Sequence, residues 1–146
     1  MLSGILAAGV HHRQPSAETH FRAVLQNDAT NVTAMNNLAW LLNEQSKPGA
    51  LELARRAVEL QPRRADLLDT FALVLAKNKQ MAEALAQQKK VVEFDPVTPV
   101  YRLNLARLAL ENREYPLARE QLDKLSAMGK AFPAQTEVWE LRKQLP

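Results

Sequence analysis

Few residues of the chain have types and spacings that could support catalysis or metal binding. The three histidines are His11, His12 and His20, and an adjacent pair cannot direct both imidazoles at one metal from a single helix face. His12 and His20 are eight residues apart, which is about two helical turns and too far for a zinc-ligand pair. Because the sequence has no cysteine, thiolate nucleophiles, disulfides and Cys-based metal sites are excluded. We therefore expect no metal site.

Hydroxyl and carboxylate side chains give no stronger catalytic pattern. No serine lies in a nucleophile-elbow sequence, and the four glycines are isolated rather than gathered in a phosphate-binding loop. Asp66 and Asp69 are three residues apart and could form a carboxylate pair, but carboxylates early in a helix more often complement the helix dipole. These observations predict a protein that is not an enzyme and needs no cofactor.

A 34-residue period organises most of the chain. Small and large apolar residues, and prolines, recur at this interval in the sets Ala50, Ala84 and Ala118; Pro62 and Pro96; Ala72 and Ala106; and Phe71 and Leu105. A fixed period of this length is typical of stacked helical hairpins, in which each hairpin buries its apolar face against its neighbours.

Prolines and the 3.6-residue apolar pattern together delimit the helices. The predicted helices cover residues 16–27, 31–45, 48–60, 65–77, 80–93, 98–111, 115–127 and 134–144, after a shorter apolar segment at 2–10. No stretch alternates apolar and polar residues convincingly, so we expect no sheet. No apolar run approaches the roughly 18 residues of a membrane span. The fold class expected is all-α.

The repeated residues resemble the tetratricopeptide repeat (TPR) family, whose pattern combines W-x2-L-G-x2-Y with A-x3-F and a closing proline. The matching sets are Leu38 and Ala39, Phe71 and Ala72, and Leu105 and Ala106 in first helices, with Ala50, Ala84 and Ala118 in second helices. The consensus Trp and Tyr are missing, and Gln88 and Arg102 are polar at nominally apolar positions.

The resemblance implies one domain over residues 1–146, a right-handed superhelix of antiparallel helix hairpins. Its parts would be a partial repeat at 1–30, repeats at 31–63, 64–97 and 98–130, and a C-terminal capping helix at 133–146. Residues 1–10 place Leu2, Ile5, Leu6 and Val10 on an apolar strip. We expect self-association through this strip, or else disorder of these ten residues, and a chain that is the C-terminal piece of a longer solenoid. A complete small protein is the alternative.

In TPR proteins one face of the first helices looks into a concave groove. The corresponding residues here predict a peptide-binding groove formed by Asn36, Trp40, Asn43, Asp69, Leu73, Leu103 and Arg107. Trp40 would anchor the peptide, Leu73 and Leu103 would extend the apolar floor, and Arg107 would hold an acidic group. Stacking of helices could bury part of this side, which we expect for Val100 and Leu110, whereas the helical wheel leaves Trp40 undecided.

The expected function is a non-catalytic protein–protein interaction scaffold that binds a peptide segment of a partner; a structural spacer within a longer TPR array is the alternative. Basic pairs such as Arg55-Arg56 and Lys89-Lys90 are diluted by acidic neighbours and lack stacking aromatics, so we expect no nucleic-acid partner. A weaker resemblance, to the C-terminal repeats of bacterial TPR lipoproteins linked to exosortase and exopolysaccharide export, implies a periplasmic or outer-membrane location. Without it a cytoplasmic location is expected, so the sequence leaves the compartment open.

Overall fold

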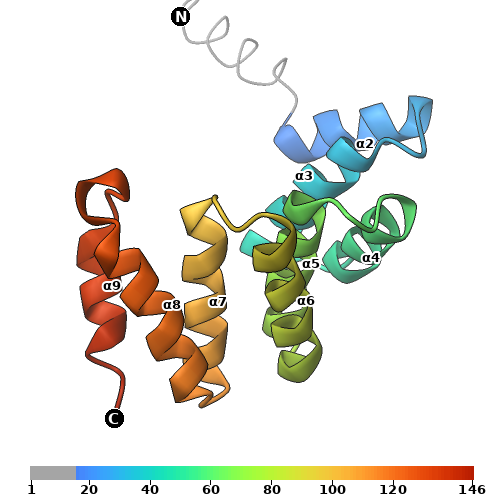
Figure 1. Cartoon of the computed structure of the whole chain (residues 1–146). Helices are drawn as coiled ribbons and strands as arrows, with labels where there is room; N and C mark the ends of the chain where they lie inside the picture. The colour runs from blue at the N-terminus through green and yellow to red at the C-terminus, as the bar shows by residue number, and fades with distance from the viewer. Residues whose placement is uncertain (1–15) are drawn as a thin grey trace, which may run out of the picture.

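A computed structural model describes residues 16–146, which form α-helices and one 3₁₀ helix without a strand (Figure 1). The helices are α2 (Ala17–Asn27), α3 (Val32–Glu44), α4 (Ala50–Leu60), α5 (Ala65–Lys77), α6 (Met81–Phe94), α7 (Pro99–Glu111), α8 (Tyr115–Ala127), η1 (Gly129–Ala131) and α9 (Gln135–Arg142). Every helix predicted from residue 16 onward is present. The segment at 2–10, and the self-association expected of it, lie outside the described residues.

Local chemistry fixes where several helices begin. The Ser16 hydroxyl accepts a hydrogen bond of 3.2 Å from the Thr19 amide, and the Asn31 side chain accepts one of 2.9 Å from the Ala34 amide. Each satisfies a backbone donor that has no partner within its own helix. α7 begins with Pro99, whose missing N–H is not needed in the first turn.

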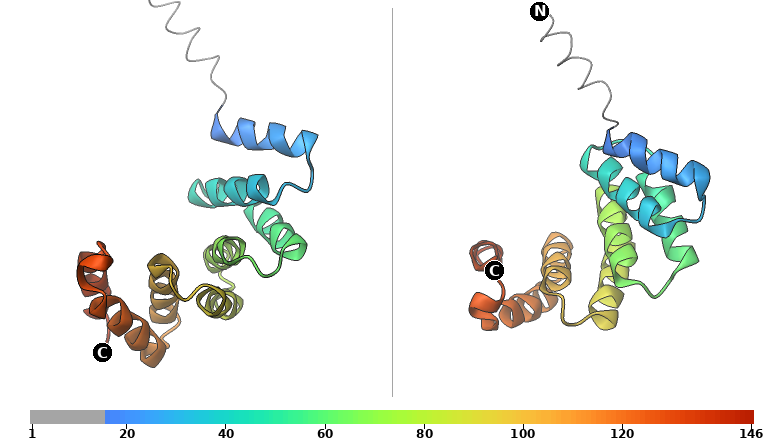
Figure 2. Two further views of the ribbon diagram at one scale, coloured as in Figure 1. Left: turned by 45° about the horizontal axis from the view of Figure 1, so that its top comes forward. Right: turned by 90° about the horizontal axis from the view of Figure 1, so that it is seen from above.

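The helices pack as three hairpins, α3 with α4, α5 with α6 and α7 with α8. Each hairpin also contacts the next through α4 and α5 or through α6 and α7, while α2 packs on α3 and α9 on α8. Successive helices therefore follow one another in a curved row, with α2 at one end and α9 at the other (Figure 2).

Each hairpin turn contains one non-glycine residue in the left-handed backbone region. Ser46, Lys79 and Arg113 have φ values of 54°, 62° and 59°. After each, the next backbone N–H donates back into the preceding helix, as in the 2.9 Å bond from Gln80 to the Leu75 carbonyl. This pairing closes the C-terminus of the first helix and reverses the chain. The two helices of each hairpin are thus joined by a turn of the same kind.

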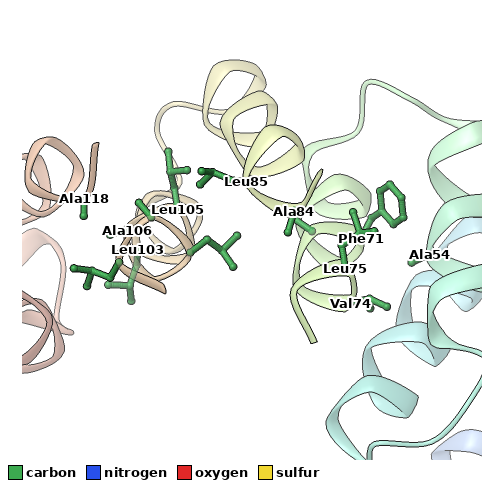
Figure 3. Close-up of a cluster of buried hydrophobic side chains, with 14 of the residues drawn as sticks. Ala54, Phe71, Val74, Leu75, Ala84, Leu85, Leu103, Leu105, Ala106 and Ala118 are labelled. Carbon is green, nitrogen blue, oxygen red and sulfur yellow. The ribbon is translucent and has the colours of Figure 1, made fainter. Parts of the chain in front are cut away.

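Alanines at the helix crossings make the close packing possible. Ala72 and Ala106, and Ala84 and Ala118, follow the 34-residue period, and these four residues and Ala39 are fully buried. Larger side chains fill the space beside them, as Figure 3 shows for Phe71, Leu75, Leu85 and Leu105. Because side chains interdigitate at these crossings, one apolar core continues from hairpin to hairpin.

The two polar departures from the TPR pattern have internal hydrogen-bond partners. Gln88 is fully buried, and its side-chain amide donates to Asp69 Oδ1 at 2.8 Å and to the Tyr101 carbonyl at 3.0 Å. Arg102 donates to Gln121 Oε1 at 2.6 Å. Gln88 therefore ties α6 to α7, and Arg102 ties α7 to α8.

Candidate functional site

The first helices of the three hairpins, α3, α5 and α7, enclose one side of an open hollow of about 560 Å³. We call this hollow the groove. Its lining consists of Trp40, Asn43, Glu44, Asp69, Leu73, Ala76, Lys77, Val100, Asn104, Arg107, Leu108 and Glu111. All of these residues lie on α3, α5 or α7, as expected for the concave side of a hairpin array.

Trp40 is the largest apolar side chain of the groove, and it is 48% exposed. Leu73 lies on α5, the first helix of the second hairpin. Val100, which is 45% exposed, lies on α7, the first helix of the third hairpin. A second hollow, of about 570 Å³, lies on another side of Trp40 and includes Phe21 and Asn36. Trp40 therefore lines two hollows at once and is open to a ligand from both.

Five of the seven predicted site residues line the groove: Trp40, Asn43, Asp69, Leu73 and Arg107. Of these, Asn43 is nearly buried, at 8% exposed, and its carbonyl accepts a hydrogen bond from Lys77 Nζ. Asn36 lines the second hollow, beside Trp40. Its Oδ1 atom is enclosed and receives no hydrogen bond from a described residue.

The expectation that Leu103 extends the apolar floor is wrong, because Leu103 is 3% exposed and belongs to the core. The expectation that Val100 is buried is wrong as well. The groove residues of α7 are Val100, Asn104, Arg107, Leu108 and Glu111, a stripe at helical spacing. Leu103 and Leu110 lie outside it, and Leu110 is buried as expected.

Asp69 is the central carboxylate of the groove. Its Oδ1 atom accepts hydrogen bonds from Gln88 Nε2 at 2.8 Å and from Asn104 Nδ2 at 3.0 Å. Burial raises the pKa of Asp69 above its ordinary value, against the opposite effect of these two bonds, and nearby Asp66 raises it further. The carboxylate is thus held in place without a cationic partner among the described residues.

Arg107 is already engaged within the protein. Its guanidinium donates to Asn104 Oδ1 at 3.0 Å and forms an ion pair with Glu137 of α9. The predicted role of Arg107 in holding an acidic ligand is therefore in competition with an internal carboxylate. Sequence reasoning missed Asn104 and Glu137, although Asn104 follows Asp69 by 35 residues, one position more than a repeat.

One residue of each basic pair on the second helices has an internal partner. Arg55 lies over the Phe71 ring at 5.2 Å and within 3.8 Å of Glu83. Lys89 lies 3.6 Å from Glu114. These side chains form a mixed-charge helix surface. Within residues 16–146 there is no cluster of three potential metal ligands, and no helix is long and apolar enough to span a membrane.

No family model matches the sequence. A curated relative, the type IV pilus assembly protein PilF of Pseudomonas aeruginosa, is 29% identical over 112 residues, which are 73% of this chain and 44% of the relative. The chain thus spans less than half the length of this relative.

Several solved structures are similar to the described fold. The TPR protein TTC0263 of Thermus thermophilus is 20% identical, with a TM-score of 0.70 over 94% of this chain and 75% of that one. A PilF structure from Pseudomonas aeruginosa is 25% identical, with a TM-score of 0.65 over 86% of this chain and 64% of that one. The complex of Naa15 and Naa10 bound to HypK gives a TM-score of 0.63 at 19% identity, over 85% of this chain and 20% of that one.

Proposed function

We propose that this chain, which has a tetratricopeptide-repeat fold, is a non-catalytic scaffold and binds a peptide segment of a partner protein in its groove. The fold is that of protein–protein interaction scaffolds, and in the similar structure Naa15 and Naa10 are bound to HypK. The observation that carries the proposal is the half-exposed indole of Trp40 within the groove.

A tryptophan at this position is suited to anchor a ligand. The indole offers a large contact area with few rotatable bonds, so little side-chain entropy is lost when a ligand immobilises it. Leu73 and Val100 continue the apolar surface one hairpin at a time. An apolar surface that crosses three helices suits an extended or helical peptide better than a small compact molecule.

The likeness to PilF supports a role in assembling a larger protein complex in a bacterium, which is compatible with an export system. Only three first helices line the groove, so we expect an affinity near micromolar, or about −8 kcal/mol. A spacer role without a groove ligand is the competing function.

The test selects random phage-displayed peptides on the purified chain and measures their affinity for three proteins: the unchanged chain, Trp40→Ala and Trp139→Ala. Trp139 is 58% exposed on α9 and does not line the groove, so it provides a matched control. We expect Trp40→Ala to weaken binding by about 2 kcal/mol, or about 30-fold, and Trp139→Ala to change it little. Selected peptides that bind Trp40→Ala unchanged, or failure to select any peptide, would favour the spacer.

A further inference from the structure

The charges of the groove are unevenly compensated. Glu44, Asp69 and Glu111 line it, and none of the three forms an ion pair with a described residue. Of the two basic side chains, Arg107 is paired with Glu137. The other, Lys77, forms no ion pair with a described residue, and its ammonium group donates to the Asn43 carbonyl. The hollow is therefore lined by three unpaired carboxylates and one unpaired cation.

Asp69 is the carboxylate best placed to contact a ligand. Both of its hydrogen bonds are accepted by Oδ1, so Oδ2 is left without a donor in the described part of the chain. The donors Gln88 and Asn104 come from α6 and α7 and fix the orientation of the carboxylate. A carboxylate held in this way meets a ligand donor without having to be reoriented.

Besides the carboxylate of Asp69, the indole of Trp40 can contribute to recognising a cation. The face of an indole attracts an ammonium or guanidinium group, and a carboxylate nearby adds a charge-assisted hydrogen bond. Trp40 and Asp69 line the same hollow, together with the apolar side chains of Leu73 and Val100. The groove therefore combines an aromatic face, an oriented carboxylate and an apolar surface.

We propose that the groove binds a peptide segment that presents a lysine or arginine side chain, flanked by apolar residues, to Asp69 and Trp40. This inference rests on the proposed function and names the chemistry of its ligand. Glu44 and Glu111, which are exposed on α3 and α7, add negative potential at the groove. An acidic peptide would meet these carboxylates and would have to displace Glu137 from Arg107.

The test uses three pools of synthetic labelled peptides, identical in apolar flanking positions and carrying lysine, norleucine or glutamate at the centre. Binding to the complete chain is measured by fluorescence anisotropy. We expect the lysine pool to bind at least about tenfold more tightly than the norleucine pool, and the glutamate pool to bind most weakly, because a charged hydrogen bond contributes more than an apolar contact of similar size.

Asp69→Asn is the decisive variant, since an amide oxygen can still accept both internal hydrogen bonds while the charge is lost. It should abolish the preference for lysine, whereas Glu59→Gln, which removes one charge from an exposed position on α4, should keep it. The double variant Glu44→Gln/Glu111→Gln should reduce the preference severalfold, and it tests the charge effect at exposed positions where folding is not at risk.

The outcomes separate this inference from the proposed function. Equal binding of the lysine and norleucine pools, or a lysine preference that survives Asp69→Asn, would overturn the inference. If the peptides in either case still bound more weakly to Trp40→Ala, the groove would remain a peptide-binding site, but one that does not recognise a basic side chain through Asp69. Binding of no pool would contradict both proposals.

Discussion

Asp69 of α5 and Asn104 of α7, 35 residues apart in the sequence, are joined by a hydrogen bond of 3.0 Å between adjacent hairpins. Asn104 is 5% exposed and also accepts a hydrogen bond from Arg107, which pairs with Glu137. A chain of polar contacts thus runs from α5 through α7 to α9. It aligns the first helices with the capping helix and holds the groove carboxylate in position.

The burial of Asp69 makes a prediction about stability and pH. The raised pKa means that the folded protein takes up a proton at Asp69 before the unfolded chain does. Asp69 therefore costs stability above its folded pKa, and this cost disappears as the pH falls through that pKa to the ordinary value. We expect Asp69→Asn to increase the free energy of unfolding at neutral pH, by an amount that shrinks on acidification. Urea denaturation of the variant and of the unchanged chain, at neutral pH and at acidic pH, measures this difference in the free energy of unfolding. A variant that is less stable than the unchanged chain at neutral pH would contradict the prediction.

The alanines at the helix crossings make a second prediction. Ala84 and Ala118 have no exposed surface, so leucine at either position must push the paired helices apart. We expect Ala84→Leu or Ala118→Leu to lower the free energy of unfolding by about 1–3 kcal/mol. Ala86→Leu places the same side chain on the exposed face of α6 and should have little effect. Unchanged thermal melts for both buried substitutions would mean that the assigned helix register is wrong.

The hairpin turns make a third prediction. Lys79 is exposed and has a φ of 62°, a conformation that is unfavourable for a side chain with a Cβ atom. Glycine adopts this conformation freely but loses more backbone entropy on folding. We expect Lys79→Gly to raise the free energy of unfolding by about 0.5–1 kcal/mol. Lys90→Gly, within the exposed face of α6, should lower it instead. A loss of stability in the first variant would argue against a strained turn.

The sequence predicts the helices and their crossings well, because both depend on local or periodic features. Proline positions limit the helices, and the 34-residue period places buried alanines at matching positions, such as Ala72 and Ala106 or Ala84 and Ala118. The exposure of the Trp40 side chain does not follow from these features, because its position on the helical wheel is compatible with either burial or exposure. Its 48% exposure depends on how α2, α3 and α5 are spaced.

The groove residues of α7 were harder to predict. Val100 and Leu103 are less than one turn apart, so a modest rotation of α7 decides which of them faces the groove. The ion pair of Arg107 with Glu137 depends on how α9 packs on α8, which the helical pattern alone does not predict. Asn104 is polar on a helix whose neighbours are apolar, and this contrast is the signal that could have indicated a bonded carboxylate such as Asp69.

The last prediction concerns Trp40 itself, the residue on which the groove depends. The chain has two tryptophans, so Trp139→Phe leaves Trp40 as the sole indole. Because Trp40 is half exposed, we expect its fluorescence in this variant to be red-shifted and readily quenched by acrylamide. Trp40→Ala in the unchanged background should alter the free energy of unfolding by less than about 1 kcal/mol. A blue-shifted emission that resists quenching, together with strong destabilisation by Trp40→Ala, would mean that Trp40 belongs to the core. The groove would then lack its anchor, and peptide binding there would have to depend on Leu73 and Val100 alone.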